Sequence, residues 1–219
     1  MTLVETHGLA SMSDEAQLRW VALGDTTRQA AVVMLHGGPG LPDYLGDVAP
    51  MVADLAPVYR YDQRGTGRSP WRGRHSLARH VDDLTELLDA WDVPEAVLIR
   101  HSYGTDLASR FCLRHWRWAA QGARRRRPVN WAMNGELGGE GRADPLDERL
   151  ADLRACLPAR TELLGGAEDP RPVSALESLA LRLDLPLTRI EGAGHEPWLE
   201  QYDTVRAHLR RFVQGSVGP

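Results

Sequence analysis

The feature that most constrains the fold of this chain is the alternation of short apolar runs with apolar stripes at helical spacing. Six runs are predicted strands, at residues 17–22, 31–35, 57–61, 96–99, 161–164 and 187–190. The run 31–35 is apolar at every position, as in a strand that helices cover on both faces. Strands that alternate with helices indicate βαβ units and a parallel sheet.

Apolar residues three or four positions apart predict helices in three places, and we interpret these stripes as core packing. The stripes consist of Leu77, Val81, Leu84, Leu88 and Trp91; of Leu146, Leu150, Leu153 and Leu157; and of Val205, Leu209 and Phe212.

Composition excludes several classes of function. The chain has 219 residues, 42% of them hydrophobic, which is enough for one globular domain with a small insertion. A formal net charge of −4 provides no overall basic field for nucleic acid. No stretch reaches the roughly 20 apolar residues of a membrane helix, and no signal peptide is visible. Cys112 and Cys156 form no disulfide framework, so we expect a cytoplasmic protein without nucleic-acid or membrane partners.

The middle of the chain departs from this rhythm. From about residue 116 to 160 no β-branched run occurs, and residues 124–127 are four consecutive arginines. Such a run is sometimes a nucleic-acid patch, but in an acidic chain without a second basic cluster we interpret it as a solvated loop or helix end.

Glycines follow the strand at 31–35 directly, in His36-Gly37-Gly38-Pro39-Gly40. Glycine lets the backbone approach a substrate and turn its amides toward it, as in an oxyanion hole for acyl transfer. A plain strand-to-loop turn would have the same composition. The next strand ends in residues 61–69, where we expect Asp62 and Arg64 to hold a loop through charge-assisted hydrogen bonds.

A serine lies where the strand at 96–99 gives way to a helical pattern, in Arg100-His101-Ser102-Tyr103-Gly104. A sharp strand-to-helix turn projects such a serine clear of the sheet and places the N–H of Tyr103 where it can bind an oxyanion. A serine hydroxyl needs a histidine base and an acid that orients the histidine.

Both partners occur downstream, each just past a predicted strand. Asp169 follows the strand at 161–164, with Glu168 as a rival acid one position earlier, and His195 follows the strand at 187–190. A single Asp or His in a loop is usually a surface residue. Three such residues at three strand ends, in the order serine, acid, histidine, indicate a catalytic triad.

These motifs, in this order, resemble the α/β-hydrolase superfamily and within it the proline iminopeptidase-like serine hydrolases. The resemblance covers roughly residues 15 to 115 and 145 to 213. It implies a mostly parallel central sheet flanked by helices, with Ser102 as nucleophile, His195 as base and Asp169 as its orienter. It implies the amides of Gly38 and Tyr103 as the oxyanion hole, and neither a metal nor an organic cofactor.

The chain departs from the pattern of that family in two ways, at one residue before the serine and in the length of the segment after the nucleophile helix. The family has glycine two residues before the serine, where strand and helix approach closely, and this chain has Arg100. The family also has a further central strand and a helical cap after the nucleophile helix. Here the helix is predicted to end near His115, which leaves about 30 residues for both. We therefore expect a truncated cap and a sheet that has lost a strand between those of Ser102 and Asp169.

The resulting prediction is a hydrolase core in two parts, residues 1–115 and 146–219, separated by a truncated cap or linker at 116–145. Its substrate would be a small peptide or ester, with the release of an N-terminal residue, proline first, favoured by the resemblance. Glu136 is a candidate for binding the free amine of the substrate, although an ordinary exposed glutamate would look the same. A broad carboxylesterase on small acyl esters and an inactive hydrolase-fold binding protein remain open alternatives. The oligomeric state is not predicted.

Overall fold

A five-stranded mixed sheet forms the centre of the computed structural model, which describes residues 3–120, 145–171 and 173–217. The strand order is β1-β2-β4-β3-β5. The antiparallel part pairs β1 with β2 and β2 with β4, and the parallel part pairs β3 with β4 and with β5. These strands are β1 (Glu5–Ser11), β2 (Gln17–Leu23), β3 (Ala30–Leu35), β4 (Val58–Tyr61) and β5 (Glu95–Arg100).

Strand β3 explains why both faces of this sheet are covered. Its odd-numbered residues, such as Val33, belong to an apolar cluster with helices α1 (Leu77–Ala90) and α2 (Tyr103–Ala120). Its even-numbered residues, such as Met34, belong to a second cluster on the other face. Because successive side chains of a strand point to opposite faces, an unbroken apolar run requires cover on both sides.

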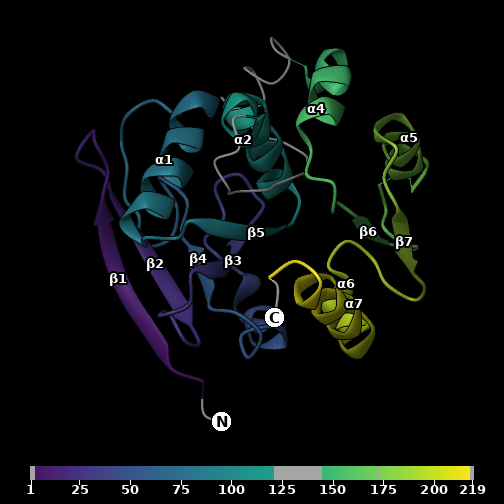
Figure 1. The fold of residues 1–219 in the computed structure, drawn as a ribbon, viewed down its shortest axis with the longest axis horizontal. Coiled ribbons are helices and arrows are strands. Elements are labelled where there is room, and N and C mark those ends of the chain that lie inside the picture. The colour runs from purple at the N-terminus through teal and green to yellow at the C-terminus, as the bar shows by residue number, and fades with distance from the viewer. Residues whose placement is uncertain (1–2, 121–144, 172, 218–219) are drawn as a thin grey trace.

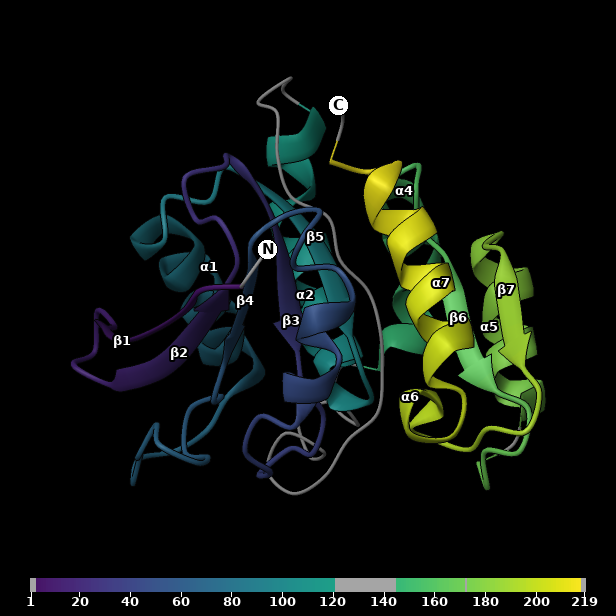
Figure 2. The same cartoon turned by 90° about the horizontal axis from the view of Figure 1, so that it is seen from below.

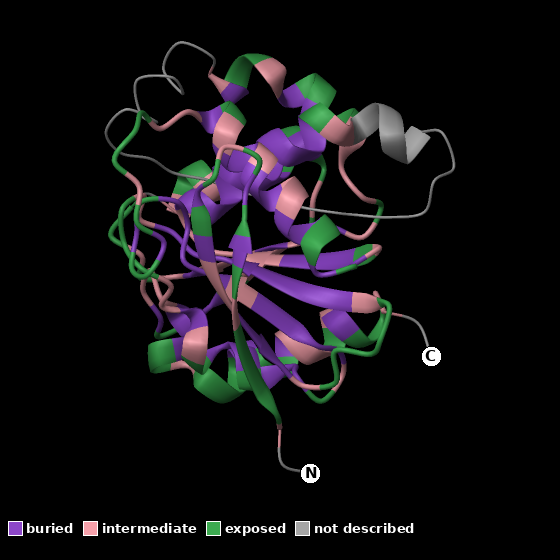
Figure 3. Ribbon diagram, turned by 90° about the vertical axis from the view of Figure 1, so that its left-hand side faces the viewer, coloured by how far each residue is buried: buried purple, intermediate pink, exposed green. Residues whose placement is uncertain are grey.

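The second cluster contains the short helices η1 (Leu45–Asp47) and η2 (Ala49–Met51) and helices α6 (Pro197–Glu200) and α7 (Tyr202–Gln214). Figure 1 shows α1 and α2 on one side of the sheet and α7 on the other. Buried residues fill the strands between these layers (Figure 3). Among the described helices, none is long and apolar enough to cross a membrane.

A separate two-stranded parallel sheet consists of β6 (Leu163–Gly166) and β7 (Leu187–Ile190). It lies beyond β5 (Figure 2), with α5 (Val173–Leu183) next to it. The short η3 (Leu146–Arg149) and α4 (Leu150–Cys156) pack their leucines on Cys112 and Leu113 of α2. No strand of the described residues joins β5 to β6. The predicted loss of a strand concerns the chain between Ser102 and Asp169, of which residues 121–144 lie outside the described part.

The six predicted strands are confirmed to within about two residues, and β1 is an addition. Residues 5–11 alternate exposed and buried positions only weakly, so the sequence does not mark this edge strand. The prediction that the nucleophile helix ends near His115 is wrong, because α2 continues to Ala120. The four arginines and most of the predicted cap lie outside the described residues.

The predicted structural role of Asp62 and Arg64 is confirmed. Asp62 accepts hydrogen bonds from the amides of Asp43 at 2.8 Å and Arg68 at 3.0 Å. The fully buried guanidinium of Arg64 binds Asp83 of α1, at 2.6 Å and 2.8 Å, and Asp14 of the β1–β2 turn. These bonds tie the loop after β4 to the elements on either side of it.

Candidate active site

Ser102 occupies a strained turn between β5 and α2. Its φ is +52°, a left-handed conformation that a non-glycine residue adopts at a cost of about 1–3 kcal/mol. The turn is closed by hydrogen bonds from the amide of Gly104 to His101 O and from that of Thr105 to Ser102 O, both 3.0 Å. This is the geometry of a nucleophile elbow, which exposes the serine hydroxyl at the end of a strand.

Two glycines allow the elbow to lie against the end of β3. A Cβ at Gly104 would lie 2.1 Å from Leu35 O, and one at Gly37 would lie 2.5 Å from Ser102 Cβ. Either position excludes a side chain unless the backbone moves. Arg100 takes the place of the family's glycine, and its Nη1 turns back along β5 to donate a 3.2 Å hydrogen bond to Leu98 O.

His195 and Asp169 lie in the loops that follow β7 and β6, and they form a pair. His195 Nδ1 lies 3.0 Å from Asp169 Oδ2. The structure therefore selects Asp169 over Glu168, which contributes its backbone amide to this loop, in a bond to Ala193 O. Asp169 is held by its second oxygen, which accepts a 2.9 Å hydrogen bond from the amide of Arg171.

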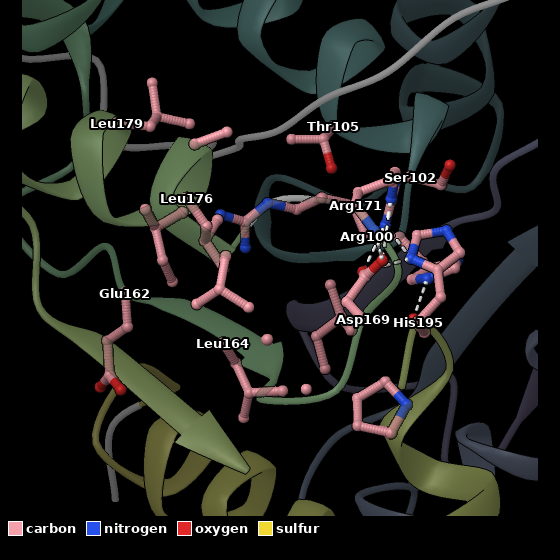
Figure 4. A pocket seen from close by; sticks show the side chains of 18 of the residues that line it. Arg100, Ser102, Thr105, Glu162, Leu164, Asp169, Arg171, Leu176, Leu179 and His195 are labelled. Carbon is pink, nitrogen blue, oxygen red and sulfur yellow. Dashed lines mark hydrogen bonds and ion pairs between the residues drawn. The ribbon is translucent and has the colours of Figure 1, made fainter. Parts of the chain in front are cut away.

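Ser102, Asp169 and His195 all line one cavity of about 690 Å³. Figure 4 shows the three residues on one side of this cavity and Leu164, Leu176 and Leu179 on the other. In the described part of the chain, no hydrogen bond joins the Ser102 hydroxyl to His195. The pair and the nucleophile thus share a cavity, and the proton-transfer contact between them is not formed in this conformation.

Arg171 is a neighbour of the predicted triad residues, and the sequence pattern did not reveal it. Its Nη2 lies 2.8 Å from Asp169 Oδ2 and also contacts His195 Nδ1. A carboxylate only accepts hydrogen bonds, whereas a guanidinium only donates them, so the two neighbours favour opposite tautomers of His195. The tautomer that Arg171 favours carries its proton on Nε2, where a general base must be free to accept one.

A second feature absent from the sequence prediction is a hydrogen-bonded chain beneath His195. The amide of Gly37 donates to Tyr44 Oη at 2.9 Å, and Tyr44 Oη lies 2.6 Å from His101 Nδ1. His101 Nε2 lies 2.7 Å from His195 O. Since a carbonyl can only accept, His101 donates through Nε2 and accepts the Tyr44 hydroxyl proton at Nδ1, which is the neutral imidazole.

Burial lowers the pKa of His101 to about 4, and the nearby Arg171 acts in the same direction, in agreement with a neutral ring. His101 was within the motif that pointed to Ser102 and could have been noticed there. Tyr44 carried no such signal, because its contact with His101 spans 57 positions of sequence.

The remaining predicted site residues are the two of the oxyanion hole, Gly38 and Tyr103, and the candidate amine-binding residue Glu136. Gly38 has a φ of +132°, which glycine adopts without strain, and Tyr103 is buried at the first position of α2. Glu136 lies outside the described residues. Within residues that the structure describes, no group of three or more His, Cys, Asp or Glu side chains is arranged to hold a metal ion.

Comparison with known proteins supports the α/β-hydrolase fold that the sequence motifs predict. Residues 30–122 match the family model described as alpha/beta hydrolase fold. A proline iminopeptidase of Heyndrickxia coagulans is 37% identical over 89 residues, which are 37% of this chain and 30% of that protein. The curated relatives are matched over 30–46% of their own length.

Solved structures share the fold over nearly the whole chain. The 2-hydroxy-6-oxo-6-phenylhexa-2,4-dienoate hydrolase of Rhodococcus sp. strain RHA1 superposes with a TM-score of 0.72 at 17% identity, covering 96% of this chain and 99% of that one. A proline iminopeptidase-related protein of Thermus thermophilus superposes with a TM-score of 0.66 at 20% identity, covering 98% and 99%. Together with the family-model match, these structures show that the chain has the α/β-hydrolase fold, and the match to the proline iminopeptidase supports a resemblance to that superfamily.

Proposed function

We propose that this chain is a serine hydrolase that acts through an acyl-enzyme, with Ser102 as nucleophile, His195 as general base and Asp169 as its orienter. The observation that carries the proposal is the left-handed Ser102 at the end of β5, beside a His195–Asp169 pair that comes from the ends of two other strands. The backbone strain at Ser102 is typical of a catalytic elbow and has no evident structural purpose.

The mechanism follows from these positions. Ser102 Oγ attacks the substrate carbonyl while His195 Nε2 takes its proton, and the amides of Gly38 and Tyr103 bind the developing oxyanion. His195 then protonates the leaving group. The acyl-enzyme is hydrolysed by a water that His195 activates in turn.

An activity-based probe tests this mechanism directly. A fluorophosphonate should label the folded protein at Ser102, and Ser102→Ala should reduce labelling to the level of heat-denatured protein. Ser178→Ala is the matched control, because Ser178 lines the same cavity but lies on α5, away from the elbow. Absence of labelling in the folded wild-type protein, or full turnover by His195→Ala, would reject the mechanism.

The substrate class that the similarity favours is a small peptide from which an N-terminal residue is released. The local likeness to a proline iminopeptidase supports this choice. Hydrolysis of a prolyl arylamide at a higher kcat/KM than that of short p-nitrophenyl esters would support the peptidase.

A specific observation favours the alternative, a carboxylesterase on small acyl esters. Arg100 lines the cavity and has no carboxylate partner among the described residues, so its positive charge repels the free amine that an aminopeptidase must bind. An uncharged ester meets no such penalty. The reverse ratio of kcat/KM values in the same assay would select this function.

A binding protein without activity is the third possibility. The missing contact between Ser102 and His195, and the presence of Arg100 two positions before the serine, both favour it. The fluorophosphonate experiment separates this possibility from the two enzymes, because only an activated serine reacts.

A further inference from the structure

The cavity beside the triad is bounded by the edges of two strands. Its lining includes the consecutive residues 98–100 of β5, and the consecutive residues 162–166 that end in β6. Successive side chains of a strand point to opposite faces, so a cavity that touches every residue in turn lies along the edge of the strand. The cavity is therefore a slot between the outer edges of β5 and β6, and Figure 2 shows no other labelled strand between them.

Hydrogen bonds on the other side of β5 show which of its backbone groups point into the slot. The amide of His101 donates to Leu35 O, at the end of β3, at 3.0 Å. Because backbone groups of alternate residues point to opposite neighbours, those of Leu98 and Arg100 point away from β3. The bond from Arg100 Nη1 to Leu98 O agrees with this direction.

The edge of β6 has the same arrangement. The amide of Leu163 donates to Pro186 O at 2.8 Å and that of Ala167 donates to Ile190 O at 2.9 Å, both toward β7. The backbone groups of Leu164 and the amide of Gly166 therefore point into the slot. Within the described ranges, no strand pairs with either edge.

Arg100 gives the slot a charge. Its Nε is buried and has no hydrogen-bond partner in the structure, and no carboxylate is paired with its guanidinium among the described residues. Burial lowers the pKa of Arg100 to about 10, which leaves the guanidinium charged at neutral pH. A buried cation without a carboxylate partner is unfavourable, and a carboxylate is its natural complement.

We propose that the slot between β5 and β6 binds an extended peptide as an added strand, with an acidic side chain of that peptide on Arg100. Strand addition supplies partners to two rows of outward-pointing backbone groups at once, which an alkyl chain of the same volume cannot do. The cavity has the volume of an ordinary ligand site, and its leucines suit apolar side chains on either side of the acidic one. The proposal does not depend on catalysis.

Binding of defined peptides to Ser102→Ala tests the proposal in the absence of turnover. The probe is a fluorescent, end-blocked pentapeptide of valine and threonine with a central glutamate, measured by anisotropy. Replacing the glutamate by glutamine should weaken binding about tenfold, since a charge-assisted bond is lost. N-methylation of alternate backbone amides should weaken binding by about tenfold or more, because the side chains remain and the strand pairing is lost. Equal affinity for the N-methylated and unmodified peptides would overturn the proposal.

Two arginine variants locate the acidic contact. Arg100→Met should abolish the preference for glutamate over glutamine. Arg182→Met is the control, because Arg182 also lines the cavity but is about half exposed and pairs with Asp147 at 2.8 Å. A preference that survives Arg100→Met, or one that is lost in Arg182→Met alone, would contradict the role of Arg100.

Hydrogen exchange measured by NMR on the protein with its native Arg100 gives a readout that does not require this substitution. On peptide binding, exchange should slow at the amides of Leu98, Arg100 and Leu164, while Ile99, whose amide already faces β3, should change little. Protection of the first three amides before peptide is added would mean that the slot is already filled, by this chain itself or, if protection depends on protein concentration, by a second copy. Either result would overturn the proposal of peptide binding. A positive fluorophosphonate reaction would still support the proposed serine hydrolase, so the two proposals can fail separately.

Discussion

At the residue scale, Arg171 contacts both members of the His195–Asp169 pair, and this contact bears directly on the proposed mechanism. Arg171 neutralises the carboxylate that should stabilise a histidine cation, and it favours the tautomer in which Nε2 already carries a proton. The same contact also orders the loop after β6, since the Arg171 amide and guanidinium both bind Asp169. In the proposed mechanism, Arg171 therefore positions Asp169 as the acid while it opposes His195 as the base.

We predict that Arg171→Met increases the rate of fluorophosphonate labelling about tenfold. Loss of the guanidinium leaves Asp169 as the partner of His195 Nδ1 and frees Nε2 to accept the serine proton, which amounts to about 1.4 kcal/mol of barrier. The measurement is the second-order labelling rate at neutral pH. Arg189→Met, which removes an exposed arginine of β7 paired with Glu177, should leave the rate unchanged. A slower rate in Arg171→Met would mean that ordering of Asp169 is the more important effect.

At the element scale, the site depends on how closely α2 begins beside the end of β3. Gly104 permits this approach, because any side chain there would meet the carbonyl of Leu35. A second glycine permits a close approach between the loops that carry Asp169 and His195, since a Cβ at Gly166 would lie 2.0 Å from Gly194 O. Glycines thus permit two close approaches, one between the start of α2 and the end of β3 and one between the end of β6 and the loop of His195.

Gly104→Ala should lower the free energy of unfolding by about 1–3 kcal/mol and should also reduce labelling of Ser102, because the start of α2 must move away from β3. Urea unfolding followed by circular dichroism measures the first effect. Gly46→Ala is the matched control, since its added Cβ would make only ordinary contacts near 3.7 Å with Arg60. Equal unfolding free energies for the two variants would show that the elbow has room for a methyl group.

At the scale of the whole molecule, buried neutral histidines make stability sensitive to acid. Burial lowers the pKa of His80 to about 3 and that of His101 to about 4, both below the ordinary value near 6.5. The unfolded chain therefore binds more protons than the folded one below about pH 6.5. The contribution of these groups to stability is complete above that pH and is lost as the pH falls toward about 4.

Between about pH 6 and 4, we expect these two histidines to lower the free energy of unfolding by about 2–3 kcal/mol for each pH unit. Each histidine takes up about one proton on unfolding, which is worth about 1.4 kcal/mol per pH unit. Urea denaturation at a series of pH values measures it. His80→Leu should reduce the slope by about one proton, whereas His7→Gln, which changes a half-exposed histidine, should not. Identical slopes for wild-type protein and His80→Leu would contradict the assignment.

The sequence by itself determined the βαβ framework and the order of the chemistry-bearing residues along the chain. These are local properties: the unbroken run at β3 requires cover on both faces, and a serine between a strand and a helix must lie on a turn. Only the tertiary structure decided between Asp169 and Glu168, since that choice depends on where two loops meet.

Tertiary structure alone also revealed Arg171, the Tyr44–His101 chain and the slot between β5 and β6. Arg171 and His195 are 24 positions apart and Tyr44 and His101 are 57 apart, so no periodicity or spacing links them. The slot has no sequence signature of its own, because it consists of backbone groups whose direction is set by the pairing of β5 with β3 and of β6 with β7. Sequence pattern specifies which residues a strand buries, while the partners of its free edge are decided only when the sheet forms.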